Sequence, residues 1–93
     1  MDFGYQELEE VEVLEDTGLE DEKNLVVFND DHNTFDHVIS TLIKVCKHDQ
    51  HQAEQCTYII HFNGKCAVKK GALPTLRPMR EGIVDAGINA EIH

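Results

Sequence analysis

The stretch Asn24–Val38, which reads NLVVFNDDHNTFDHV, decides the fold, because a strand-like run and a helix start meet inside it. Leu25–Phe28 is a short apolar run typical of a buried strand. It stops at Asn29, and two adjacent carboxylates, Asp30 and Asp31, follow before the helix start. Like charges side by side repel each other, so water, a metal ion, backbone donors or a cationic ligand should compensate them.

Two amphipathic patterns after this junction predict two helices. The first covers about residues 34–47, with Asn33 as N-cap and Asp36 three positions later, as in a capping box. After a polar turn at residues 48–51, a second pattern extends from residue 53 to the glycine at position 64, which suits a left-handed C-cap.

A third helical pattern is interrupted by Pro74 and Pro78, which do not suit a helix interior. Thr75 as N-cap places Pro78 at the third helical position, where its missing N–H costs little. The regular helix is therefore predicted to start near Leu76 and to end at Gly87.

Two further strands complete the predicted domain. Residues 66–68 form one strand, residues 69–71 a turn, and residues 88–92 the last strand. The order βααβαβ predicts an α+β domain in which three helices pack on an antiparallel three-stranded sheet.

The charge of the chain is distributed unevenly. The 93 residues suffice for one small domain, and their formal net charge is −10. Residues 1–23 contain ten acids and one base, whereas residues 24–93 contain eight acids and seven bases. We therefore predict an acidic, disordered N-terminal extension over residues 1–23 and a core domain over residues 24–93. An acidic tail and a nearly neutral domain argue against nucleic acid as a partner.

The cysteines and the lack of long apolar runs indicate the cellular compartment of the protein. No run approaches the ~20 apolar residues that a transmembrane helix needs, and no signal peptide is visible, so we expect no membrane partner. Cys46, Cys56 and Cys66 form an odd set without a CxxC motif. This usage is typical of free, buried thiols in a reducing compartment, and we expect a cytoplasmic protein.

The residues at the strand–helix junction permit several interpretations. The simplest is a turn whose Asx side chains bond nearby backbone N–H groups. Carboxylates and an amide oxygen also suit Mg²⁺ or Ca²⁺, although the spacing matches no calcium loop. A small metal-binding protein or metal-dependent enzyme using Asp30, Asp31 and His61 is therefore an alternative, and His48-x-x-His51 is a weaker candidate for a transition metal.

Two motifs resemble the signatures of the ClpS family. The first is the stretch already quoted, with Asn29-Asp30-Asp31 between strand and helix, and the second is Ile59–Lys65, IIHFNGK. They stand about thirty residues apart, as the family requires, and the resemblance covers about residues 24–92. The family fold is similar to the C-terminal domain of the bacterial ribosomal stalk protein, so a stalk-like interaction domain is a further alternative.

The resemblance implies an adaptor rather than an enzyme. ClpS proteins bind the N-terminal destabilising residue, Leu, Phe, Tyr or Trp, of N-degron substrates. They deliver these substrates to a ClpA- or ClpC-type AAA+ unfoldase of the ClpP protease. No cofactor and no resident metal is implied.

The resemblance also implies the residues of a peptide site. Asn29, Asp30 and His61 would surround the α-ammonium of the ligand, and Asp31 would hold the loop or the following peptide backbone. Asn33 stands where the family has a Thr hydroxyl. The ligand's own cation would thus compensate the adjacent carboxylates.

The implied side-chain pocket lies between the first two helices. Phe35 replaces the gatekeeping Met that is usual in the family, and Thr57 replaces an apolar residue. The positions that match the family's pocket are Phe35, Val38, Thr57, Ile60 and Ile88.

Overall fold

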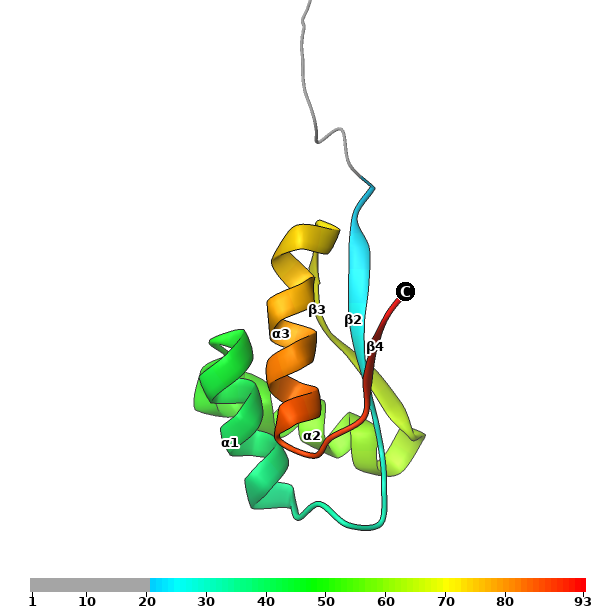
Figure 1. Cartoon of the computed structure of the whole chain (residues 1–93). Helices are drawn as coiled ribbons and strands as arrows, with labels where there is room; N and C mark the ends of the chain where they lie inside the picture. The colour runs from blue at the N-terminus through cyan, green and yellow to red at the C-terminus, as the bar shows by residue number, and fades with distance from the viewer. Residues whose placement is uncertain (1–20) are drawn as a thin grey trace, which may run out of the picture.

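The computed structural model describes residues 21–93, which form three helices and three strands (Figure 1). The elements are β2 (Lys23–Phe28), α1 (Phe35–Cys46), α2 (Gln50–Asn63), β3 (Lys65–Gly71), α3 (Leu73–Asp85) and β4 (Ala90–Ile92). The predicted α+β class and βααβαβ order are confirmed. The predicted tail lies, up to residue 20, outside the described residues, but Lys23, which we assigned to that tail, belongs to β2.

The sheet is antiparallel, with β2 in the centre and the order β3-β2-β4. Val27 pairs with Cys66 on β3 and with Ala90 on β4. The register shifts between Leu25 and Val26, where β3 carries one extra residue opposite β2. Leu25 and Val27 are completely buried, as expected for alternate residues of a central strand that face the core.

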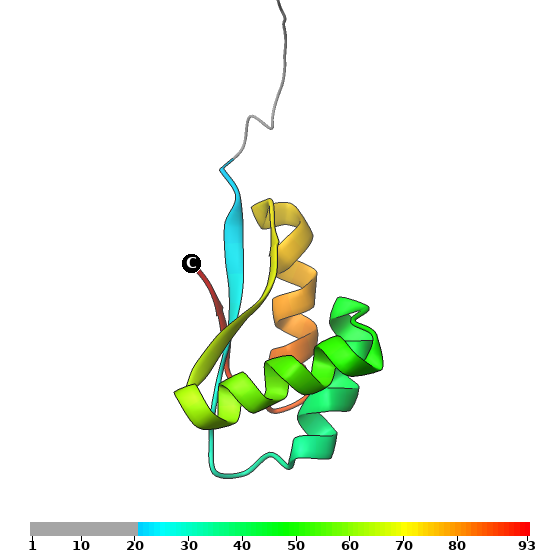
Figure 2. The same ribbon diagram turned by 180° about the vertical axis from the view of Figure 1, so that it is seen from behind.

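One hydrophobic core joins all six elements, because each helix and each strand contributes at least one buried side chain. In the view of Figure 2, α2 crosses the near side of the domain toward α1. The fully buried side chains of largest volume are Leu25, Leu42, Leu76, Ile83, Val27 and Cys46. None of the three helices in the described part of the chain is long and apolar enough to cross a membrane.

The start of α1 differs from the prediction by one residue. Thr34, not Asn33, is the N-cap, and its hydroxyl oxygen accepts a hydrogen bond from the backbone N–H of His37 at 3.1 Å. The predicted capping box of Asn33 with Asp36 is therefore wrong. Both residue types are good N-caps, and the Asn33 side chain is engaged in the tertiary contacts described below.

The second helix begins earlier than its apolar pattern suggested. Asp49 is its N-cap and accepts a hydrogen bond from the backbone N–H of Gln52 at 2.7 Å. The helix starts at Gln50, so half of the predicted turn at residues 48–51 is helical. Its end at Gly64 agrees with the prediction, since this glycine has a φ of 93°, which side chains disfavour.

The turn predicted at residues 69–71 is also wrong, because these residues extend β3. Lys69, Lys70 and Gly71 pair with the first three residues of β2, which begins at Lys23. Pairing with a neighbouring strand, rather than the local Lys-Lys-Gly sequence, decides the conformation here. The last strand, in contrast, is shorter than predicted and covers only Ala90–Ile92.

The third helix starts at Leu73, three residues before the predicted start. Its N-cap is Ala72, without a side-chain cap hydrogen bond, so the prediction of Thr75 as N-cap is wrong. Pro74 lies in the first turn, where a backbone N–H has no partner inside the helix. Pro78 lies inside the helix at an exposed position, and the helix continues through it although the proline cannot donate a backbone hydrogen bond.

Candidate functional site

The β2–α1 loop, the end of α2 and the end of α3 meet at one end of the domain (Figure 1). The backbone N–H of Asn29 donates to the carbonyl oxygen of Gly64 at 2.8 Å, which joins the end of β2 to the end of α2. Asn33 donates through its side chain to the carbonyl oxygen of Gly87 at 2.9 Å, which joins the loop to the end of α3. The loop is therefore held at both of its ends.

Within this loop, Asp30 accepts three hydrogen bonds. Its Oδ1 accepts from the backbone N–H groups of His32 at 2.8 Å and Asn33 at 2.9 Å. Its Oδ2 accepts from Nδ2 of Asn33 at 2.7 Å. Partial burial acts to raise the pKa of Asp30, but the three hydrogen bonds outweigh it and hold the pKa below the ordinary value.

The hydrogen-bonding capacity of the Asp30 carboxylate is not exhausted. An ionised carboxylate offers about four acceptor positions, two on each oxygen. The two backbone donors use Oδ1, and Asn33 uses one position of Oδ2. One position on Oδ2 therefore remains for a donor, on a carboxylate whose orientation and charge are already set.

Aromatic rings from α1 and α2 form a cluster. The ring centroid of Phe35 lies 5.0 Å from that of His61 and 5.3 Å from that of Tyr58, both in edge-to-face geometry. Phe62 stacks on Tyr58 at 6.1 Å and is 73% exposed. Edge-to-face pairs of this kind stabilise the position of the Phe35 ring.

A small pocket with both polar and apolar walls lies between α1 and α2, and Phe35 is one of its lining residues. Its volume is about 20 Å³, enough for roughly one water molecule. The hydroxyl of Thr57 donates to the carbonyl oxygen of Ala53 at 2.7 Å, so the one hydroxyl in the wall of the pocket from α2 already has an acceptor. The lining residues are Asn29, Asn33, Thr34, Phe35, Val38, Thr57, Ile60 and His61.

Most of the residues that the sequence indicated are brought together here. Seven of the lining residues were indicated, and Thr34 was missed, although its type and its place before an amphipathic run identify it as an N-cap. Asp30 is joined to the site through Asn33, whereas Asp31 is exposed and lies outside the pocket lining. Ile88 is buried in the core and does not line the pocket.

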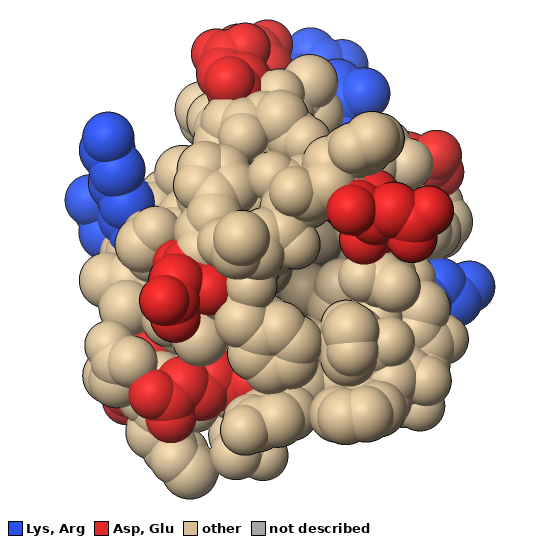
Figure 3. Space-filling view, turned by 90° about the horizontal axis from the view of Figure 1, so that it is seen from below, with Lys and Arg blue, Asp and Glu red and all other residues tan. Residues whose placement is uncertain are grey.

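Figure 3 views the molecule from this end, where acidic groups are spread over the face and the basic groups stand at its edge. Asp31 and Asp36 are exposed there, in the loop and the first turn of α1. An acidic face favours the approach of a cationic ligand.

The metal alternatives find no geometric support. Within residues 21–93, no three His, Cys, Asp or Glu side chains are grouped so that they could hold a metal ion. Asp30, Asp31 and His61 therefore do not form such a site. His48 is buried with Nε2 2.8 Å from the carbonyl oxygen of Val68, whereas His51 is exposed.

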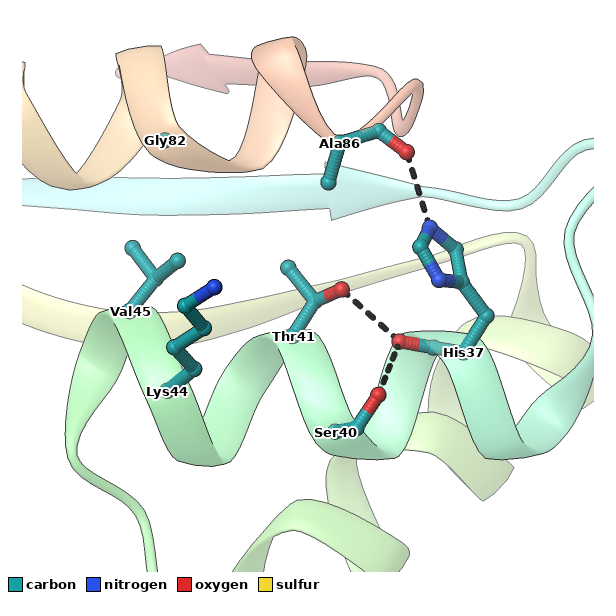
Figure 4. Close-up of a pocket in the computed structure, with 7 residues that line it drawn as sticks. All are labelled: His37, Ser40, Thr41, Lys44, Val45, Gly82 and Ala86. Atoms are coloured by element: carbon teal, nitrogen blue, oxygen red, sulfur yellow. Dashed lines mark hydrogen bonds between the residues drawn. The ribbon is translucent and has the colours of Figure 1, made fainter.

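A separate groove lies between α1 and α3 (Figure 4). Its volume is about 390 Å³, and its lining residues are His37, Ser40, Thr41, Lys44, Val45, Gly82 and Ala86. A Cβ at position 82 would lie 3.2 Å from both methyl groups of Val45, so the glycine permits the close approach of the helices. Nε2 of His37 lies 2.8 Å from the carbonyl oxygen of Ala86 and joins the two helices at one end of the groove. None of these residues was indicated by the sequence motifs.

Comparison with known proteins agrees with the two motifs. The family model of the ATP-dependent Clp protease adaptor protein ClpS matches residues 20–88. The E3 ubiquitin-protein ligase UBR1 of Mus musculus and that of Homo sapiens are each 34% identical to the chain over 68 residues. These 68 residues are 73% of this chain but only 4% of each ligase, so the chain spans a small part of the length of these relatives. The match over most of the described core shows that the chain belongs to the ClpS family of Clp protease adaptor proteins.

Proposed function

We propose that this protein is an N-degron adaptor, which binds the α-ammonium and the apolar side chain of a substrate's N-terminal residue. The observation that carries the proposal is the Asp30 carboxylate, which is oriented by three hydrogen bonds, keeps one acceptor position, and is bonded to Asn33, a residue that lines the pocket between α1 and α2. Membership of an adaptor family supports the same function.

The proposed site distinguishes a chain terminus from the interior of a chain. An α-ammonium has a positive charge and three donors, whereas an internal peptide N–H has one donor and no charge. Asp30 takes one of these donors, and the side chains of Asn29 and His61 take the others. A hydrogen bond to a charged group is worth about 1.5–3 kcal/mol, so the loss of the charge alone removes a large part of the affinity.

The ligand's side chain enters the pocket only when Phe35 moves, because the present volume of about 20 Å³ holds roughly one water. Moving Phe35 gives up its edge-to-face contacts with Tyr58 and His61, which are worth about 0.5–1.5 kcal/mol each. Burial of a Leu or Phe side chain returns about 1.5–3 kcal/mol. The cost of moving Phe35 and the gain from burying the ligand's side chain are comparable, so only a large apolar N-terminal side chain gives a net gain in binding free energy. Leu, Phe, Tyr and Trp are therefore the proposed N-terminal residues.

The proposed partner after binding is a ClpA- or ClpC-type AAA+ unfoldase of the ClpP protease, in the cytoplasm. The support is the family's description as an adaptor of the ATP-dependent Clp protease. All residues of the proposed site lie within residues 24–93, and residues 1–22, which precede β2, are proposed to act as an extension of this core.

Asp30→Asn tests the ammonium site, because it removes the charge and keeps the size of the side chain. We expect at least a tenfold loss of affinity for a fluorescent Leu- or Phe-initiated peptide, measured by anisotropy. Asp36→Asn is the matched control, since it removes an equal charge from an exposed side chain nearby that does not line the pocket.

N-acetylation of the same peptide tests the site from the ligand's side. The acetyl group removes the charge of the α-ammonium, so binding should be lost with wild-type protein. If the acetylated peptide binds as tightly as the free one, or if Asp36→Asn weakens binding as much as Asp30→Asn, the proposed site is wrong.

A further inference from the structure

At the other end of the domain, lysines and amides line a hollow of about 400 Å³. Lys69 and Lys70 contribute two cations from β3, and Asn24 and Gln52 contribute side-chain amides from β2 and α2. Ala67 and Val68 complete the lining. All four polar side chains can donate hydrogen bonds, so the hollow suits a ligand that carries carboxylates.

The two lysines of this hollow have no carboxylate partner in the described part of the chain. Within residues 21–93, no lysine lies within salt-bridge distance of a carboxylate, and the one such contact joins the His93 ring to Glu91 of β4. Lys69 is half-buried, and its positive charge contributes to lowering the pKa of the nearby His48, after burial, which is the larger cause. A ligand with negative charge would therefore relieve an unpaired positive charge.

The chain itself carries such a ligand next to the hollow. Residues 1–22 contain ten acids and no base, and they join β2 at Lys23, one residue before Asn24 of the hollow. Because this segment is covalently attached at the rim, its association with the hollow is intramolecular and needs no external ligand concentration. A net charge of −10 also disfavours nucleic acid as the occupant.

We infer that the acidic segment of residues 1–20 binds the hollow formed by Asn24, Gln52 and residues 67–70. Its carboxylates pair with Lys69 and Lys70, and the amides of Asn24 and Gln52 donate further hydrogen bonds. Figure 1 shows the start of β2 at the opposite end of the domain from the β2–α1 loop. Binding there keeps eight acids away from the ammonium site and leaves that site open.

Carbodiimide cross-linking of the full-length protein tests this contact. The reagent activates a carboxylate, and a lysine in direct contact displaces it to form an amide, which digestion and mass spectrometry locate. We expect at least fivefold more links from residues 1–20 to Lys69 and Lys70 than to Lys44 and Lys47, which are exposed as Lys70 is. Lys23 lies three residues after the segment, so it controls for proximity in sequence and should form fewer links than Lys69 and Lys70.

The links should disappear at about 1 M salt, where the screening length falls to about 3 Å. A mixture of ¹⁴N- and ¹⁵N-labelled protein identifies links between two copies, because these combine both isotopes. Equal linking to all exposed lysines, a maximum at Lys23, or links that mostly combine both isotopes would each overturn the inference.

A second measurement does not depend on cross-linking. In a full-length variant with the eight acids of residues 1–20 replaced by Asn or Gln, the side-chain amide NMR signals of Asn24 and Gln52 should shift. The amide signal of Asn33, at the other end, should stay in place. Unchanged signals for Asn24 and Gln52 would also overturn the inference, whatever the outcome for the peptide site.

Discussion

Asn33→Ala should weaken peptide binding through Asp30 rather than through a lost contact with the ligand. In the structure, Asn33 Nδ2 donates to Asp30 Oδ2 at 2.7 Å and to the carbonyl oxygen of Gly87 at 2.9 Å. The substitution removes both bonds but keeps the two backbone N–H bonds to Asp30 Oδ1. The carboxylate therefore stays in the loop, but its second oxygen is no longer oriented.

The expected magnitude follows from the bond that orients Asp30. A hydrogen bond to a charged acceptor contributes about 1.5–3 kcal/mol, and the half-buried position of Asn33 lets water replace part of it. We therefore expect a loss near the lower limit, about 1.4 kcal/mol, which is a tenfold increase in Kd. The exposed Asn63, the last residue of α2, provides the control, and Asn63→Ala should leave Kd unchanged.

The assay is anisotropy with a Leu-initiated peptide, combined with a double-mutant cycle. If Asn33 acts through Asp30, Asn33→Ala should cost little in the Asp30→Asn background, because no carboxylate remains to be oriented. Additive losses in the double mutant would refute this reasoning and would indicate that Asn33 contacts the ligand independently.

The pH profile gives a further readout. Burial acts to raise the pKa of Asp30, and the hydrogen bonds that outweigh it include the one from the Asn33 side chain. Its removal should move the pKa of Asp30 upward. Binding requires the ionised form and is lost as the pH falls through this pKa, so the loss should begin at a higher pH in Asn33→Ala than in wild type. If wild type and Asn33→Ala lose binding over the same acidic pH range, Asn33 does not act through Asp30.

Three other predictions follow from the pocket and the buried titratable groups. Ile- and Val-initiated peptides should bind at least tenfold more weakly than a Leu-initiated peptide, a difference of about 1.4 kcal/mol. Phe35→Ala should reduce this difference in affinity. If the ratio of the Kd values is unchanged in Phe35→Ala, Phe35 does not control entry to the pocket. Burial lowers the pKa of His48 from 6.5, so the unfolded state binds the proton first and the free energy of unfolding should decrease as the pH falls below about 6.5. In urea titrations, His48→Gln should make this decrease in the free energy of unfolding smaller, and His51→Gln should not change it. If the free energy of unfolding of His48→Gln depends on pH as that of the wild type does, His48 is not the responsible group. Burial raises the pKa of Cys46 to about 11 and that of Cys66 to about 12. Iodoacetamide should therefore label both thiols far more slowly at pH 8 in the native protein than in urea. Equal labelling rates in the two states would show that the native thiols are accessible and ionised.

Local signals predicted those parts of the fold whose cause is local. The apolar run at Leu25–Phe28 and the periodicity of α1 and α2 reflect which side chains must leave water, and this pattern is legible without a structure. Gly64 was predicted to end α2 because glycine adopts a positive φ at little cost. Family motifs, also local in sequence, indicated most of the pocket lining.

Two of the incorrect predictions share a different cause. Asn33 and Thr34 are equivalent N-cap candidates in sequence, and the choice between them depends on Gly87, which lies 54 residues away from Asn33. Residues 69–71 have the composition of a turn, but pairing with β2 extends the strand through them. In each case a long-range contact overrides a local preference of similar size.

The sequence by itself determined the element order, the apolar core positions and the chemical groups of the site, because these depend on side-chain type and spacing. Only the tertiary structure decided how Asp30 is oriented and charged, how small the pocket lined by Phe35 is, and that Ile88 belongs to the core. Hydrogen-bond geometry and free volume depend on distances of a few tenths of an ångström between segments far apart in the chain. Residue type and spacing along the sequence do not specify such distances, and the packed fold does.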